Sequence, residues 1–214
     1  MAPKPVAFPM AENDPEFLKN NRSEPTLTWI DHSTLLLQFE GLNILTDPHL
    51  TRRASPVSFV GPERYMKPGI SIEDLPHIDL IVISHNHYDH LDRLTLEKIH
   101  QKQKDQPPRI FVPLNQKEWF EDLKIPNVIE MDWWEEQEYL KWKIHAVPVQ
   151  HWSGRSLFDR NQVLWAGWVL EHPKFRFFFA GDTGYSNDFI DLGKNLKASI
   201  WLRFPLERTA QDGS

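Results

Sequence analysis

The sequence predicts an α/β fold in which helices cover β-sheets. Strand-like apolar runs alternate with amphipathic stretches along the chain, and strand-like segments are concentrated toward both ends. A continuous run of β-branched apolar residues, IDLIVISH at 78–85, is typical of a buried central strand, and a histidine-rich motif follows it directly. Ligands in α/β folds gather at the carboxyl ends of such strands.

The N-terminal half contains the clearest turn signals. Residues 1–25 are rich in proline, asparagine and charge and predict an extended arm, which precedes one expected domain at 26–204 and an irregular tail at 205–214. Two strands are expected at 26–39 and 42–46 around a turn at Glu40-Gly41. The proline-rich segment 48–76 predicts a long loop, and loops of that length are often functional.

The remaining elements follow from hydrophobic periodicity. Leucine and isoleucine recur at helical spacing in 91–102, and further helices are expected at 114–123 and 186–196, the last with Ser186 as its N-cap. The other expected strands are 109–113, 128–131, 138–149, 162–171, 174–182 and 198–204, of which 162–171 and 174–182 form a hairpin around His172-Pro173.

Composition restricts the chemistry. With 214 residues the chain can bury one sizeable core, and its net charge of −6 does not favour nucleic acid as a partner. Because the chain has no cysteine, any metal must be held by nitrogen and oxygen. The N-terminal stretch has no long apolar core, and no apolar run approaches the roughly 20 residues of a membrane span. We therefore expect a cytoplasmic protein without a signal peptide.

The motif SHNHYDHLD at 84–92 contains the main candidates for a metal site, namely His85, His87, Asp89 and His90. Imidazole nitrogens and carboxylate oxygens are good ligands for zinc, iron or manganese. In an extended segment, residues two apart point the same way, so His85 and His87 can share one metal. Asp89 and His90 lie where the next helix begins and can reach a second metal. The alternative is a solvated loop that is rich in histidine.

HNHYDH resembles the HxHxDH signature of the metallo-β-lactamase fold superfamily. TWIDHSTLLLQFEGLNILTDP, VPVQHWSGRS and FFFAGDTGYS resemble the branch that contains the N-acylphosphatidylethanolamine phospholipase D enzymes. The resemblance covers about residues 20–200 and implies an αββα sandwich. From Ser199 onward the sequence departs from the family pattern, so we expect a C-terminally truncated fold with an incomplete second half.

The resemblance also implies further ligands. It places His151 with His85 and His87 at a first metal, and Asp182 with Asp89 and His90 at a second, with two zinc ions as the expected cofactor and iron or manganese as alternatives. Taken alone, His151 is as readily a structural histidine, and Asp182 a turn cap. The last histidine of the family pattern is not matched, and water, His32, His49 or another chain are open as replacements.

The implied activity is metal-dependent hydrolysis, with Asp89 as the catalytic group that orients the attacking water. We expect a phosphodiesterase acting on N-acylphosphatidylethanolamine-type phospholipids, with peripheral membrane contact. The open alternatives are a lactonase, a hydrolase of small phosphate esters, and an inactive truncated metal-binding remnant. Arg155 is a candidate for pairing with a substrate phosphate, and a plain surface arginine is the equal alternative.

Overall fold

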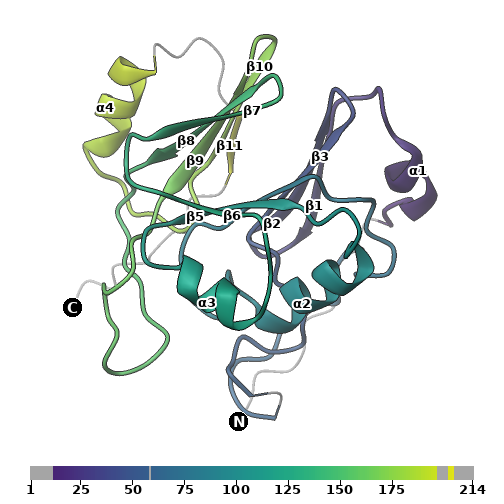
Figure 1. Ribbon diagram of the computed structural model, residues 1–214, viewed down its shortest axis with the longest axis horizontal. Helices are drawn as coiled ribbons and strands as arrows, with labels where there is room; N and C mark the ends of the chain where they lie inside the picture. The colour runs from purple at the N-terminus through teal and green to yellow at the C-terminus, as the bar shows by residue number, and fades with distance from the viewer. Residues whose placement is uncertain (1–11, 58, 197–201, 205–214) are drawn as a thin grey trace. The chain divides into compact units, whose positions relative to one another are not determined.

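The structure is a computed structural model that describes residues 12–57, 59–196 and 202–204 (Figure 1). Its strands form two sheets, in the orders β1-β2-β3-β4-β5-β6 and β11-β10-β9-β8-β7. The chain divides into two compact units that do not follow the two sheets strictly: the first comprises residues 1–82, 88–110 and 123–127, and the second 83–87, 111–122 and 128–214. The predicted α/β class is confirmed, and the expected domain bounds stay a prediction.

The first unit contains the N-terminal hairpins and one long helix. Its elements are α1 (Pro15–Asn20), β1 (Thr26–Asp31), β2 (Thr34–Phe39), β3 (Leu42–Thr46), β4 (Leu80–Val82), α2 (Arg93–Lys102) and the start of β5 (Arg109–Pro113). Helix α1 lies in the range expected to be extended. It forms because Pro15 suits the first helical position and the Asp14 carboxylate accepts hydrogen bonds from the N–H groups of Glu16 and Phe17.

Strands β1 to β4 determine the position of the histidine motif, which follows β4. The expected strand 26–39 is broken into β1 and β2 at His32, whose φ of 38° turns the chain. Strand β4 pairs in parallel with β3, with Ile44 opposite Leu80, and all three β4 side chains are buried. It is shorter than the expected 78–85, so the motif lies in an irregular segment just after the strand rather than on it.

Helix α2 follows the motif. It begins two residues later than expected because Asp92 is its N-cap, with its carboxylate accepting from Leu94 N at 3.2 Å. Its buried face includes Leu96 and Ile99, in agreement with the predicted spacing, whereas Leu94, which belongs to the same predicted spacing, is 50% exposed. The expected loop at 48–76 is confirmed, because the described residues between β3 and β4 form no strand beyond an isolated bridge of Arg53 with Glu63.

The second unit contains the five-stranded sheet. Its elements are the remainder of β5, α3 (Lys117–Asp122), β6 (Val128–Met131), β7 (Glu136–Tyr139), β8 (Trp142–Val147), β9 (Gly167–His172), β10 (Phe175–Phe179), α4 (Asp188–Asn195) and β11 (Leu202–Phe204). Leu192 of α4 packs in a buried cluster with Val147, Val169 and Phe178 of the sheet. This packing explains the apolar face of the helix.

Several expected bounds shift in this unit. The hairpin around His172-Pro173 is confirmed, although β9 begins at Gly167 rather than at 162. Asn187, and not Ser186, is the N-cap residue of α4, and Ser186 Oγ instead lies 2.6 Å from Asp188 Oδ2. Residues 198–201 of the expected last strand and the tail at 205–214 lie outside the described residues. Among the helices that the structure describes, none is long and apolar enough to cross a bilayer.

Candidate metal centre

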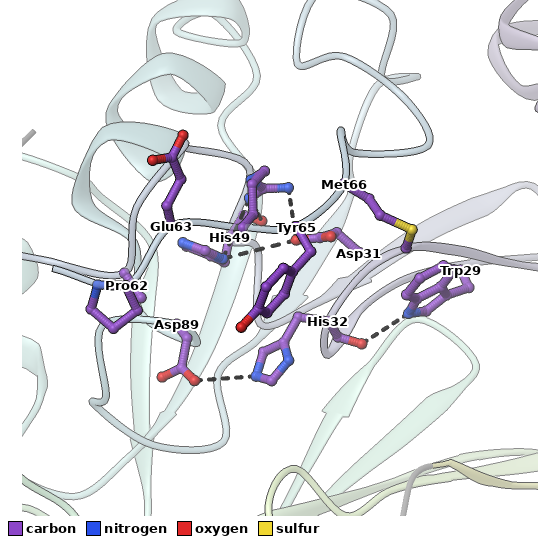
Figure 2. Close-up of a pocket in the computed structure, with 11 residues that line it drawn as sticks. Trp29, Asp31, His32, His49, Pro62, Glu63, Tyr65, Met66 and Asp89 are labelled. Carbon is purple, nitrogen blue, oxygen red and sulfur yellow. Dashed lines mark hydrogen bonds and ion pairs between the residues drawn. The ribbon is translucent and has the colours of Figure 1, made fainter. Parts of the chain in front are cut away.

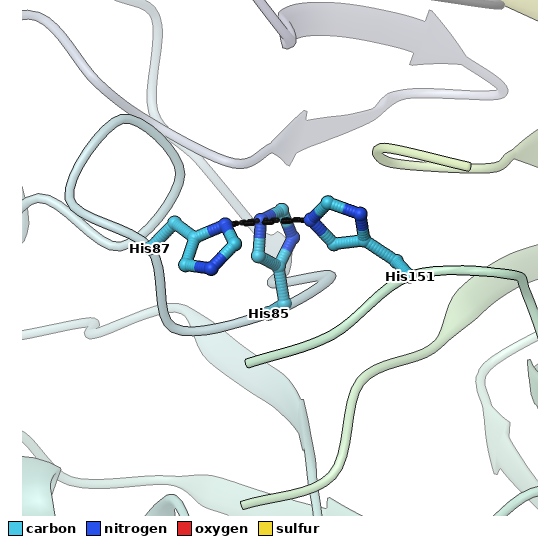
Figure 3. Close-up of side chains that lie close together, drawn as sticks. All are labelled: His85, His87 and His151. Carbon is cyan, nitrogen blue, oxygen red and sulfur yellow. Dashed lines mark hydrogen bonds between the residues drawn. The ribbon is translucent and has the colours of Figure 1, made fainter. Parts of the chain in front are cut away.

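Three histidine side chains meet in the second unit (Figure 3). His85 Nε2 lies 2.8 Å from His87 Nδ1, and His151 Nε2 lies 3.1 Å and 3.3 Å from the same two atoms. His85 and His87 come from the segment after β4, and His151 comes from the segment after β8, 66 residues further along the chain. The structure therefore brings together the three residues expected at the first metal.

The donor set fits a metal ion. Tetrahedral zinc with Zn–N bonds of about 2.0–2.1 Å has its nitrogen ligands about 3.3 Å apart, close to the separations of these three ring nitrogens. The other nitrogen of His85, Nδ1, lies 2.8 Å from the Ser84 hydroxyl. A proton on Nδ1 that is shared with Ser84 leaves the lone pair of Nε2 directed toward the cluster, as metal-binding histidines require. These His85, His87 and His151 nitrogens form a group that can hold a divalent metal.

The loop after His151 is tied to the histidine motif. Gly154 N donates to Asn86 Oδ1 at 2.7 Å, and Arg155 Nη1 donates to the Asn86 carbonyl at 2.8 Å. The Trp152 and His87 rings contact edge to face at 4.2 Å between centroids. Arg155 also lies 5.4 Å from the centre of the Trp119 ring. These contacts give Arg155 a role in holding the loop, and its pairing with a substrate phosphate stays a prediction.

Asp182 lies beside this cluster, with Oδ2 at 3.9 Å from His151 Nε2. The preceding Gly181 has a φ of +59°, and a Cβ built on it would lie 2.5 Å from the Ser84 Cβ. Only glycine permits both this backbone conformation and this approach. The small-residue turn around Asp182 is therefore required to fit the chain against the histidine motif.

The other two motif residues belong to the first unit. His90 is fully buried, and its Nδ1 lies 2.6 Å from Asp47 Oδ2, which is also fully buried. Its Nε2 lies 3.2 Å from His32 Nε2, and His32 Nε2 lies 3.2 Å from Asp89 Oδ2. Because Asp89 and His90 are in the first unit and Asp182 is in the second, their sharing of one metal stays a prediction.

Asp89 has an altered proton affinity. Burial alone would raise the pKa of this carboxyl, but the hydrogen bond from His32 and the positive charges that His90 and His32 carry at acidic pH outweigh it. The pKa of Asp89 is therefore held well below its usual range. At neutral pH the group is a carboxylate that can accept a hydrogen bond or bind a cation.

A cavity of about 430 Å³ opens beside Asp89 and His32 in the first unit (Figure 2). Trp29, Tyr65 and Met66 line it on the apolar side. Such a combination of apolar walls and a few polar groups is typical of small-molecule sites. The cavity suits a ligand that has an apolar part and a part that reaches a carboxylate.

The sequence alone does not point clearly to two of these side chains. Asp47 was not predicted, although it follows β3 in the sequence TDP, and His32 was expected only as one of several open replacements for the unmatched histidine. Both were hard to find because their partner His90 is 43 and 58 residues away in the sequence. The only local signal is that each follows a strand closely, as ligands in α/β folds do.

Comparison with known proteins decides the family. Residues 42–202 match the family model described as "Beta-lactamase superfamily domain". This chain belongs to the metallo-β-lactamase superfamily. The group of His85, His87 and His151, which can hold a metal, agrees with this family, and the coarse prediction of a metal-dependent hydrolase family is confirmed.

Two relatives carry the same name, N-acyl-phosphatidylethanolamine-hydrolyzing phospholipase D. The N-acyl-phosphatidylethanolamine-hydrolyzing phospholipase D 1 of Caenorhabditis elegans is 40% identical over 181 residues, which are 79% of this chain and 50% of the relative. The mitochondrial enzyme of that name from Saccharomyces cerevisiae is 39% identical over 166 residues, 75% of this chain and 35% of the relative. The chain thus spans half or less of the length of these relatives.

The superfamily fold is also seen in solved structures. A possible metal-dependent hydrolase from Veillonella parvula matches with a TM-score of 0.65 at 19% identity, over 84% of this chain and 71% of that one. At this level of identity the match shows the fold alone. It agrees with the expected fold and adds nothing about the substrate.

Proposed function

We propose that this chain carries out metal-dependent hydrolysis of a phosphodiester in N-acylphosphatidylethanolamine-type phospholipids. The observation that carries the proposal is the convergence of His85, His87 and His151 in a chain that is 40% identical to an enzyme named for this activity. The cavity supports it, because the apolar side chains of Trp29, Tyr65 and Met66 suit the apolar part of an amphipathic substrate.

His85, His87 and His151 would hold the metal through the three nitrogens that face one another. A bound divalent cation would supply a water of lowered pKa and would neutralise charge on the phosphoryl oxygens. The resemblance assigns Asp89, His90 and Asp182 to a second cation. Asp89, as a carboxylate, would orient the attacking water and accept its proton.

The reaction is a simple hydrolysis. The water oxygen forms a new bond to phosphorus, and the bond from phosphorus to the oxygen of the N-acylethanolamine breaks. The proton of the water passes to the leaving alkoxide by way of the carboxylate. The products are phosphatidic acid and an N-acylethanolamine, and no oxidant or reductant is needed.

The test measures metal content and turnover in the same preparation. The 214-residue chain is collected as a monodisperse gel-filtration peak, loaded with zinc, and incubated with N-acylphosphatidylethanolamine, a lactone and a small phosphate monoester in parallel. We expect zinc-dependent release of phosphatidic acid. We expect His151→Ala to lose at least one metal per chain and the turnover, because it removes one of the three converging nitrogens.

His77→Ala is the matched control, because His77 is an exposed histidine whose Nε2 lies 3.8 Å from Asp79 Oδ1, and it belongs to none of the donor groups found among the described residues. Its metal content and turnover should equal those of the wild type. If the zinc-loaded chain is inert while the Caenorhabditis elegans enzyme is active in parallel, the proposal is wrong for this chain. Turnover of only the lactone or the monoester would instead support those alternatives.

A further inference from the structure

Three ligand atoms converge in the first unit, apart from the His85, His87 and His151 cluster. They are His32 Nε2, His90 Nε2 and Asp89 Oδ2, with separations of 3.2, 3.2 and 3.9 Å. All three residues lie in the first unit. The family resemblance includes Asp89 and His90, but not His32.

We infer that His32 is a direct ligand, beside Asp89 and His90, of the second cation that the resemblance assigns to Asp89 and His90. The inference deepens the proposed function, on whose use of divalent metal it rests. Two imidazole nitrogens and one carboxylate oxygen suit zinc, iron or manganese. Their separations match those of ligands around a small cation, for which about 3.3 Å is typical of tetrahedral zinc.

The buried side of the site fixes the protonation of His90. Asp47 Oδ2 lies 2.6 Å from His90 Nδ1, and both side chains are fully buried. A proton on Nδ1 is therefore shared with the Asp47 carboxylate, which leaves the Nε2 lone pair directed at His32 and Asp89. Carboxylate partners of this kind orient the histidine ligands of metals.

A single hydrogen bond does not account for the positions of all three ligand atoms. His32 Nε2 can carry a single proton, yet it lies 3.2 Å from both an imidazole lone pair and a carboxylate oxygen. A cation among the three atoms would satisfy all of them at once. The arrangement of donors is the observation that favours a cation over a simple hydrogen bond.

The open side of the site faces the cavity. The side chains of His32 and Asp89 are 35% and 39% exposed and both line the cavity, whereas His90 is fully buried. Three protein ligands with one open side are the arrangement of catalytic metal sites, while structural sites are closed. The inferred site is therefore accessible to water and to a phosphoryl oxygen.

The backbone holds the His32 ring in position. His32 occupies the β1–β2 turn with a φ of 38°, and its carbonyl accepts a hydrogen bond from Trp29 Nε1 at 2.9 Å. Asparagine tolerates a positive φ better than most residues, and its side chain is too short to replace an imidazole Nε2. His32→Asn is therefore a substitution that keeps the turn and removes the ligand atom.

The test removes the other cluster first. In a His151→Ala background we expect one zinc per chain to remain, measured by elemental analysis after gel filtration. Adding His32→Asn should weaken that zinc at least a hundredfold in a competition titration with a chromophoric chelator, more than the loss of an outer partner would. Cobalt in place of zinc gives a second readout, since its visible absorption should change with the loss of a nitrogen ligand.

The control is His49→Asn in the same background, because His49 is a buried histidine that lines the same cavity but lies outside the trio. It should keep the zinc. Thermal melting in chelator should show that both double variants are as stable as their parent. Unchanged zinc affinity in the His32→Asn variant, or no zinc in the His151→Ala parent, overturns the inference.

The readouts do not depend on phospholipid turnover. Zinc that binds through His32 in a chain that cleaves no phospholipid would support the site and contradict the proposed function. Phospholipid turnover by the single His32→Asn variant, together with unchanged zinc affinity when His32→Asn is added to His151→Ala, would support the proposed function and contradict the role of His32 as a ligand.

Discussion

The hydroxyl of Ser84 lies 2.8 Å from Nδ1 of His85, the histidine whose Nε2 faces both His87 and His151. Ser84 therefore contacts the metal-site histidine His85 on the side of the ring opposite to the cluster. When Ser84 accepts the Nδ1 proton, the contact orients the ring and leaves Nε2 of His85 as the nitrogen that can bind a metal.

We expect Ser84→Ala to weaken zinc binding by about ten- to a hundredfold, because the ring loses the partner that orients it. A competition titration with a chromophoric chelator measures the change. Ser71→Ala, which removes a hydroxyl bonded to Asp74, is the control and should bind zinc as the wild type does. Equal affinities in the two variants would show that Ser84 does not orient His85.

Gly181→Ala should destabilise the protein, because φ is +59° there and the new Cβ would lie 2.5 Å from the Ser84 Cβ. We expect a loss of about 2 kcal/mol or more, and a Tm lower by about 4–8 °C. Gly193→Ala in α4 should have the opposite sign, because among the described residues no atom outside its own helix backbone and chain neighbours lies within 4 Å of the added Cβ, and alanine favours a helix. Calorimetry on both variants tests this. A rise in the Tm of Gly181→Ala like that of Gly193→Ala would contradict the packing described at Gly181.

Asp92→Ala should cost about 1–2 kcal/mol of the free energy of unfolding. Its carboxylate caps α2 at Leu94 N and also accepts from Thr95 Oγ1 at 2.6 Å and Thr51 N at 3.1 Å. Asp92→Asn keeps an acceptor oxygen at this position and should lose less. Urea unfolding of the two variants separates the contributions, and equal losses would argue against the capping role.

Glu171→Gln should change the acid stability of the second unit. Burial raises the pKa of Glu171, but the hydrogen bond and charge of Arg176, with a smaller effect of His145, outweigh it and hold the pKa below its usual range. The carboxylate therefore stabilises the folded state above the unfolded pKa of about 4.3, and this contribution disappears as pH falls through the lower folded pKa.

We accordingly expect Glu171→Gln to lower the free energy of unfolding by about 0.5–1 kcal/mol at pH 7 and by little near pH 2–3. Urea unfolding from pH 7 to pH 2 measures both values. The exposed Glu138→Gln on β7 is the control and should change neither. A loss that is as large at low pH as at pH 7 would assign the effect to packing instead.

Local patterns predicted the elements that are fixed by local chemistry. The β-branched run that ends near His85 and the amphipathic spacing of α2 gave the correct element types, because burial on one or both faces imposes these patterns. Helix α1 was missed, since six residues carry too little periodicity to outweigh a polar, proline-rich context. The break at His32 was missed because histidine is not a usual turn residue.

The sequence predicted the part of the site that the histidine motif and the family resemblance contain. His85 and His87 are two residues apart, but His151 joins them through the arrangement of β8 relative to the segment after β4. Asp47 and His32 meet His90 through the pairing of β2, β3 and β4, and neither has a spacing that points to His90. Contacts of this kind follow from the tertiary fold and are not contained in any local pattern.

The boundary between the two compact units runs through the motif itself, since residues 83–87 belong to one unit and 88–110 to the other. Neither unit corresponds to a continuous stretch of the gene. A deletion series or a pair of separately expressed fragments therefore cannot isolate the His85 cluster from the His90 cluster. Only side-chain substitutions within the intact polypeptide can assign a property to one of them.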